Sequence, residues 1–153
     1  MRVGLISDTH GLLRPEALAF LRGSNHIIHA CDITGPEILA PLEAIAPLTV
    51  VRGNNDRGAW AVALPETAVL RIGALAIYVI HDLKQLPIEP AAAGMRVVVA
   101  GHSHKPSRSE YGGVLYINPG SAGPRRFRLP ISVGELLVDG DRVTARLVTL
   151  DIN

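Results

Sequence analysis

The chain has 153 residues, of which 48% are hydrophobic and 19% charged, and its formal net charge is +1. This length suits one domain with a sizeable core, and the near-zero charge excludes a strong attraction to nucleic acid or anionic membranes. The single cysteine, Cys31, excludes an internal disulfide. The apolar run after Met1 is too short for a signal sequence, and no stretch reaches the ~20 apolar residues of a membrane span. We therefore expect one cytoplasmic domain over residues 1–153.

Strands and helices alternate in the predicted first half. Apolar runs predict strands, and apolar residues at helical spacing predict the helices between them. The expected elements are strands at 3–7, 26–30 and 48–52, with helices that begin near Pro15 and Pro36. Pro41 is expected to kink or shorten the second helix. This alternation predicts parallel strands joined by right-handed crossovers, with a ligand site at their carboxyl ends.

The second half has a different pattern, dominated by strands and hairpins. Gly112-Gly113 and Asp139-Gly140-Asp141 are typical of tight turns between paired strands. A short helix is expected at 90–93. The expected strands are 68–72, 74–80, 96–100, 107–111, 114–117, 131–138 and 142–150. Together the two halves predict one two-sheet α/β domain.

Side chains that bind metals follow five of the predicted strands. The candidates are Asp8, His10, Asp32, Asn54, His81, His102 and His104. His102 and His104 share one side of an extended segment, because side chains alternate along it. Seven ligands are too many for one tetrahedral zinc but suit two metals that share a bridging carboxylate, for which Asp32 is the natural candidate. Mixed nitrogen and oxygen ligands favour Mn²⁺, Fe²⁺, Zn²⁺ or Ni²⁺ over Ca²⁺.

Each of these residues also has a structural explanation when taken alone. Asp8 fits a helix cap, and Asn54 with Asn55 fits a turn. These explanations fail together, because they require seven coincidences at one sheet edge. Two further histidines are not predicted as ligands: His26 is expected to be exposed, and His29 to be hydrogen-bonded in the core.

The ordered series identifies a resemblance. Asp8-x-His10, Asp32, Gly53-Asn54, His81 and Gly101-His102-x-His104 resemble the motifs of the calcineurin-like metallophosphoesterases. The short chain and Asn118-Pro119-Gly120-Ser121 resemble the small single-domain bacterial and archaeal phosphodiesterases of that superfamily. The resemblance implies a four-layer α/β-β/α sandwich of two mixed β-sheets.

The resemblance also implies a dinuclear centre and a reaction. One metal would be held by Asp8, His10, Asp32 and His104, and the other by Asp32, Asn54, His81 and His102. Mn²⁺ is the expected ion, with Zn²⁺, Fe²⁺, Ni²⁺ and Mg²⁺ as alternatives. The implied activity is a phosphoesterase, more specifically a phosphodiesterase, in which a hydroxide bound by both metals attacks the phosphate ester.

Two positions depart from the family pattern. Many relatives have histidine where this chain has Asn55, and asparagine cannot deliver a proton at pH 7. We therefore expect a preference for substrates with good leaving groups. Cys31 stands where relatives often have glycine, and we interpret it as a small buried hydrophobic residue. Asp82 is a candidate partner for a ligand imidazole.

Candidate catalytic and substrate-binding residues complete the site. Asn55 and Asp56 are the catalytic candidates beside the metals. Asn55, Ser121 and Arg125 are the substrate-binding candidates, with Arg126 as an alternative to Arg125 for a bidentate phosphate contact.

The expected substrate is a small phosphate ester or a nucleotide. A nuclease is disfavoured because the chain has no basic stripe and few aromatic residues. The main alternative function is a non-catalytic metal-binding scaffold or interaction protein of the same fold. A retromer subunit with a degraded metal site is similar in fold. Complete ligands favour an enzyme, and a homo-oligomer is only a general expectation.

Overall fold

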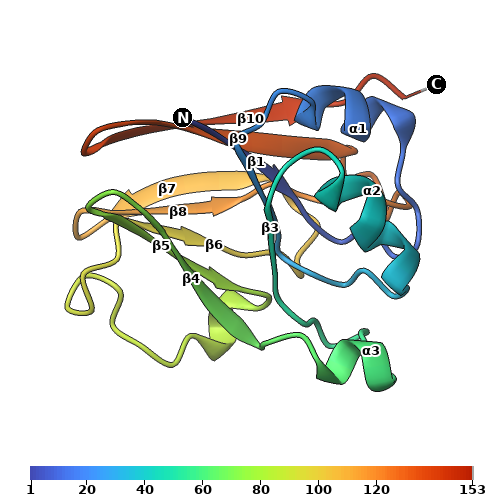
Figure 1. Ribbon diagram of the computed structural model, residues 1–153, viewed down its shortest axis with the longest axis horizontal. Helices are drawn as coiled ribbons and strands as arrows, with labels where there is room; N and C mark the ends of the chain where they lie inside the picture. The colour runs from blue at the N-terminus through green and yellow to red at the C-terminus, as the bar shows by residue number, and fades with distance from the viewer. Residues whose placement is uncertain (153) are drawn as a thin grey trace.

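The computed structural model describes residues 1–152, which build two five-stranded β-sheets that pack face to face (Figure 1). The first sheet has the order β10-β9-β1-β2-β3 and comprises β1 (Arg2–Ile6), β2 (His26–His29), β3 (Leu48–Val50), β9 (Ser132–Asp139) and β10 (Arg142–Thr149). The second has the order β4-β5-β6-β8-β7 and comprises β4 (Thr67–Ile72), β5 (Leu75–Ile80), β6 (Val97–Val99), β7 (Ser107–Tyr111) and β8 (Val114–Asn118). Both sheets are mixed, which confirms the predicted fold class.

The helices are short and few. They are α1 (Pro15–Leu21), the 3₁₀ helix η1 (Pro36–Ile38), α2 (Leu39–Glu43), α3 (Ala59–Val62) and the 3₁₀ helix η2 (Leu83–Gln85). Helices α1 and α2 pack on the outer face of the first sheet, where Leu21 and Leu42 join one core cluster with Ile27 (Figure 1). The outer face of the second sheet has only η2 and irregular segments. Within residues 1–152, no helix is long and apolar enough to cross a membrane.

Two proline-rich segments differ from regular helices. The helix predicted from Pro36 is divided into η1 and a five-residue α2, and Pro41 lies in the first turn of α2, where its missing N–H is tolerated. The helix predicted at 90–93 is wrong. That segment makes a single turn, in which Met95 N donates to Pro90 O (2.9 Å), and it ends at Gly94 with φ of +80°.

Parallel pairing brings the carboxyl ends of several strands together. β1 pairs with β2 and β2 with β3 in parallel, as predicted, and β5, β6 and β8 are also parallel neighbours. The ends of the two sheets are joined directly, because His81 Nδ1, just after β5, donates to Ala30 O, just after β2 (3.2 Å). The segments that follow β1, β2, β3, β5 and β6 therefore meet at one edge.

Arg2, at the start of β1, ties α1 to the first sheet. Its guanidinium donates to Phe20 O (2.6 Å) and Arg22 O (2.9 Å), at the end of α1, where helix carbonyls lack intrahelical donors. It also donates to the buried Glu135 carboxylate on β9 (2.5 Å), which accepts a second bond from Arg146 (2.9 Å). The Arg2 side chain thus donates hydrogen bonds both to the carbonyls at the end of α1 and to a buried carboxylate.

Replacing this guanidinium should destabilise the fold. Arg2→Met should lower the free energy of unfolding by about 3 kcal/mol, because it removes a partner from a buried carboxylate and the donors from the end of α1. Urea denaturation measures the loss. Arg71→Met, at an exposed position of β4, is the matched control and should change stability by less than about 0.5 kcal/mol. Equal losses in the two variants would contradict this role.

Candidate metal centre

Asp8 and His10 lie in the turn after β1. The Asp8 Oδ2 atom accepts hydrogen bonds from Ser7 Oγ (2.6 Å) and His102 N (3.1 Å). Its other oxygen, Oδ1, is buried and has no hydrogen-bond partner among the described residues. That oxygen lies 3.6 Å from His104 Nε2 and 3.9 Å from His10 Nε2. Burial raises the pKa of Asp8 to about 7, because the hydrogen bond from Ser7 and the charge of His81 offset the desolvation only in part.

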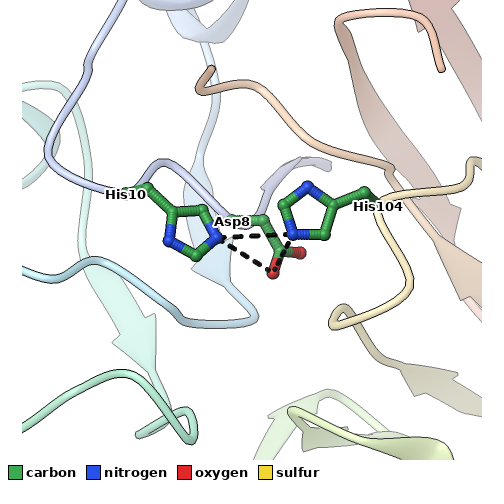
Figure 2. Close-up of side chains that lie close together, drawn as sticks. All are labelled: Asp8, His10 and His104. Atoms are coloured by element: carbon green, nitrogen blue, oxygen red, sulfur yellow. Dashed lines mark hydrogen bonds and ion pairs between the residues drawn. The ribbon is translucent and has the colours of Figure 1, made fainter. Parts of the chain in front are cut away.

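The three side chains Asp8, His10 and His104 form cluster 1, and Figure 2 shows them pointing toward one another. The His10 and His104 Nε2 atoms are 3.4 Å apart. Burial lowers the pKa of both imidazoles, and that of His104 falls to about 4 with a contribution from the positive charge of Arg126. Both rings are therefore neutral at pH 7 and retain a lone pair for a cation.

Cluster 2 comprises Asp32, Asn54, His81 and His102. The His81 Nδ1 atom is used by Ala30 O, so Nε2 is the atom that faces the cluster. It lies 3.2 Å from Asp32 Oδ2, 2.9 Å from Asn54 Oδ1 and 3.0 Å from His102 Nδ1. The amide of Asn54 would donate to His81 Nε2 (2.9 Å) and Asp32 if it were turned over. The orientation with oxygen inward is the one that a bound cation favours, because it adds a ligand.

Asp32 lies between the two clusters. Its Oδ2 is 3.2 Å from His81 Nε2 and 3.9 Å from His10 Nε2. Burial alone would raise the pKa of Asp32, but the hydrogen bond and charge of His81 outweigh it and lower that pKa to about 2. Asn55 N donates to the other oxygen, Oδ1 (3.0 Å). The ionised carboxylate thus has one oxygen placed where a ligand shared by two cations would lie.

These observations fit divalent cations. The buried Asp8 oxygen without a partner, and the neutral imidazoles of His10 and His104 beside it, remain unsatisfied unless a positive charge lies among them. The donors are nitrogen and oxygen, as expected for Mn²⁺, Fe²⁺, Zn²⁺ or Ni²⁺. Cys31 Sγ also lies near Asp32 and His81. However, burial and the neighbouring carboxylates strongly raise the pKa of its thiol, so it remains protonated and a poor ligand.

The chain matches the calcineurin-like phosphoesterase superfamily domain over residues 1–141. It belongs to that superfamily. A relative from Methanothermobacter thermautotrophicus, named "Probable metallophosphoesterase", is 35% identical over 161 residues, which cover 97% of this chain and 92% of the relative. The "Probable metallophosphoesterase YsnB" of Bacillus subtilis is 31% identical over 157 residues, with 95% and 89% covered.

Solved structures share this phosphoesterase fold. An archaeal phosphodiesterase superimposes with a TM-score of 0.80 at 22% identity, covering 97% of this chain and 100% of the other. Vps29 from Entamoeba histolytica, solved in complex with zinc, superimposes with a TM-score of 0.76 at 23% identity, covering 99% and 100%. At this identity the structures establish the fold, and the residues must supply the argument for function.

Asp56 of the phosphoesterase chain supports the site through the backbone. Its carboxylate accepts hydrogen bonds from the N–H groups of Asp32 (3.1 Å), Gly53 (2.9 Å) and Thr34 (2.8 Å). It is only 5% exposed, and both of its oxygens are used. This arrangement positions the segments that carry Asp32 and Asn54. This role was not visible in the sequence, because two of the three donors, Asp32 and Thr34, lie more than 20 residues away along the chain.

The Asn118–Ser121 turn holds the loop that carries His102 and His104. Asn118 Nδ2 donates to Gly101 O and Ser103 Oγ (both 3.0 Å). The buried Ser121 hydroxyl donates to Asp8 O (3.0 Å). The hydroxyl of Ser121, predicted as a substrate-binding group, thus donates to the protein's own loop.

Three more predicted site residues lie at the margin. Arg125 is exposed and donates to Leu129 O (3.3 Å) within its own loop, whereas Arg126 is the arginine whose charge lowers the pKa of His104. Asp82 lies 3.9 Å from His102 Nε2, too far for a hydrogen bond, and instead accepts from Lys84 N (3.0 Å) at the start of η2.

Two glycines allow the ligand segments to approach closely. A Cβ on Gly101 would collide with Ser7 Oγ and lie 2.8 Å from Asp8 Oδ2. A Cβ on Gly53 would collide with Asp32 Oδ1 and lie 2.5 Å from Cys31 Sγ. Each glycine directly precedes a candidate ligand, so the Gly-Asn and Gly-His pairs of the sequence have a steric cause.

His29 links the segments after β1 and β2, as predicted for a hydrogen-bonded core histidine. Its Nδ1 accepts from Cys31 N (2.8 Å), so Nε2 carries the proton and donates to Thr9 Oγ1 (3.0 Å). Complete burial lowers the pKa of His29 to about 3. His26 is half-buried where exposure was predicted, because its Nε2 is hydrogen-bonded to Thr49 Oγ1 (2.7 Å).

The neutral His29 should make the fold sensitive to acid. The folded-state pKa lies below the unfolded value of about 6.5, so the unfolded chain binds the proton first and stability falls as pH drops from about 6.5 toward 3. Between pH 7.5 and 5, protonation of this one group in the unfolded chain should lower the free energy of unfolding by about 2 kcal/mol. Urea denaturation in EDTA measures it against His29→Gln, which cannot titrate. The difference in unfolding free energy between wild type and His29→Gln should be about 2 kcal/mol smaller at pH 5 than at pH 7.5. Parallel pH profiles of the two proteins would refute the role of His29.

Proposed function

We propose that this protein is a metal-dependent phosphodiesterase that acts on a small phosphate ester or a nucleotide. The observation that carries the proposal is the position of Asp32 Oδ2, which lies 3.2 Å from His81 Nε2 in cluster 2 and 3.9 Å from His10 Nε2 in cluster 1. Pairs of divalent cations about 3.5–4 Å apart, bridged in this way, are suited to in-line displacement at phosphorus.

The candidate ligands divide into two sets that share Asp32. The first set is Asp8, His10, Asp32 and His104, and the second is Asp32, Asn54, His81 and His102. Two divalent cations, with Mn²⁺ as our first choice, would neutralise the phosphoryl charge and activate a water as the nucleophile.

The chain's own residues then position and polarise the substrate. The exposed Asn55 amide is assigned a hydrogen bond to a phosphate oxygen, and it cannot protonate a leaving group. Arg126, whose charge lowers the pKa of His104, shares an exposed loop with Arg125, and both are assigned to the phosphate charge. Asp56 and Ser121 act through the backbone, by holding the segments that carry Asp32 and Asp8.

A non-catalytic scaffold is the second candidate, supported by the structural similarity to Vps29. The scaffold and the enzyme share a fold, so the ligand set must discriminate between them. Here Asp8 Oδ1 is buried without a partner, an arrangement that costs free energy in a scaffold that binds no cation. This cost favours a protein that binds a cation, and the activity assay must separate an enzyme from a metal-binding scaffold.

The activity assay separates the two candidates. Purified protein with Mn²⁺ should hydrolyse bis-p-nitrophenyl phosphate faster than p-nitrophenyl phosphate, because the proposed substrate is a diester. Asp32→Ala should reduce kcat/KM by at least about 100-fold, since it removes the ligand common to both cations. The absence of turnover for both substrates, or full activity in Asp32→Ala, would support the scaffold.

Metal analysis tests the division of the ligands. His102→Ala and His104→Ala should each lower the bound metal from two ions per chain toward one, because each removes a ligand from a different set. The double variant His102→Ala/His104→Ala should retain no tightly bound ion. The control is His10→Ala/His104→Ala, which removes two ligands from one set and should still retain one ion. Elemental analysis after gel filtration gives the counts, and identical counts for both double variants would refute the division.

A further inference from the structure

We propose that a groove on the outer face of the second sheet binds one ester arm of the substrate, and that this arm is an aromatic group with polar edges, such as a nucleoside. The inference deepens the proposed phosphodiesterase function and rests on it. The groove has a volume of about 570 Å³ and lies between β6, β8, β7 and η2. That volume is within the usual range of small-molecule sites.

The floor of the groove is a cross-strand row. Val98, Tyr116 and Ser109 are paired neighbours on β6, β8 and β7, so their side chains lie on the same face of the sheet. Leu83 and Lys84 of η2 form one wall. The 3₁₀ helix η2 borders the groove, and Leu86, Ile88 and Met95 pack on the same outer face of the sheet without lining the groove.

The groove opens at the metal centre. His102 lies at its end, and its Nδ1 is 3.0 Å from His81 Nε2 in cluster 2. The same His102 and its neighbour Asp82 also line a second hollow of about 370 Å³, which continues past Asn54. A phosphorus atom bound at cluster 2 would therefore have one hollow on each side. A diester has two arms to place there, and a monoester has one.

The larger groove and the smaller hollow are lined by different kinds of side chain. This difference indicates which ester arm of the substrate binds in each. The larger groove has a buried apolar floor at Val98 and Ala100 with the half-buried Tyr116 ring, and its rim carries the Ser107 hydroxyl and the Lys84 side chain. An apolar bed with donors at the edge suits a flat heteroaromatic ring.

The smaller hollow is more polar and suits the other arm. It contains the ion pair between Arg52 Nη2 and Glu66 Oε1 (2.7 Å). We assign the aromatic nucleoside arm to the larger groove and the leaving arm to this smaller hollow.

The test fills the groove without changing any candidate ligand. Ser109→Trp places an indole on the groove floor, and Ser107→Trp does so from the next position on that face if the first variant fails to fold. Arg108→Trp is the matched control, because successive side chains on β7 point to opposite faces. The two substrates are thymidine 5′-(p-nitrophenyl phosphate) and methyl p-nitrophenyl phosphate, which share the p-nitrophenol leaving group and differ in the other arm.

Filling the groove should selectively lower kcat/KM for the thymidine diester. In Ser109→Trp, kcat/KM for the thymidine diester should fall at least 10-fold, while the value for the methyl diester should stay within twofold, with unchanged bound metal. Arg108→Trp should stay within twofold for both. No loss for the thymidine diester would overturn the inference, and an equal loss for both diesters would overturn the assignment of the arms.

Binding of thymidine 5′-monophosphate, measured by calorimetry with Mn²⁺, separates this inference from the proposed function. Wild-type protein that binds the nucleotide but hydrolyses no diester would refute the phosphodiesterase. A Kd raised at least 10-fold in Ser109→Trp would still support the groove. Turnover of the methyl diester, with equal nucleotide affinity in wild type and Ser109→Trp, would leave the phosphodiesterase intact and refute the groove.

Discussion

The crowding of carboxylates and imidazoles at one edge is the constraint on which the rest of this structure depends. Asp8, Asp32 and four imidazoles converge at one edge where two sheets meet, and Asp8 Oδ1 has no partner among the described residues. The backbone there is also strained, with positive φ at Asp8, His10, Asp32, His102 and His104. Such conformations cost about 1 kcal/mol or more each and persist only where surrounding contacts enforce them. The core between the sheets and the hydrogen bonds around the loops must therefore offset a local cost.

The residues that offset this free-energy cost lie outside the set of candidate metal ligands. Asp56 holds three backbone N–H groups, His29 links the segments after β1 and β2, and Asn118 fixes the loop after β6. Each of them connects segments that are far apart in the chain. The site is thus held by tertiary hydrogen bonds, and the short helices contribute little to it. Removing a positioning residue is expected to loosen ligand geometry before it unfolds the sheets.

The sequence was informative where local chemistry decides the structure. Apolar runs and hairpin turns located all ten strands of residues 1–152, and ligand-type side chains after the strands located the site. The polar 107–111 strand was located by the Gly112-Gly113 turn and is correct at both ends. The sequence was uninformative where contacts between distant segments decide the structure. The short helix α3 has no apolar periodicity of its own, and the segment at 90–93 turns at Gly94 although its alanines favour a helix. The backbone role of Asp56 depends on donors more than 20 residues away in sequence.

The arrangement also separates chemistry from selection of the substrate. The candidate ligands lie at the edge where strands end, whereas the groove lies on a sheet face and meets them only at His102. Side chains on the exposed edge strand β7 carry few constraints from the core, so Ser107 and Ser109 tolerate change that Asp8 or Asp32 would not. A fold with one fixed metal edge and one thinly covered sheet face can therefore alter its substrate through the groove while the ligand geometry stays intact. On the proposed assignment of the arms, the groove beside η2 sets which substrate arm fits.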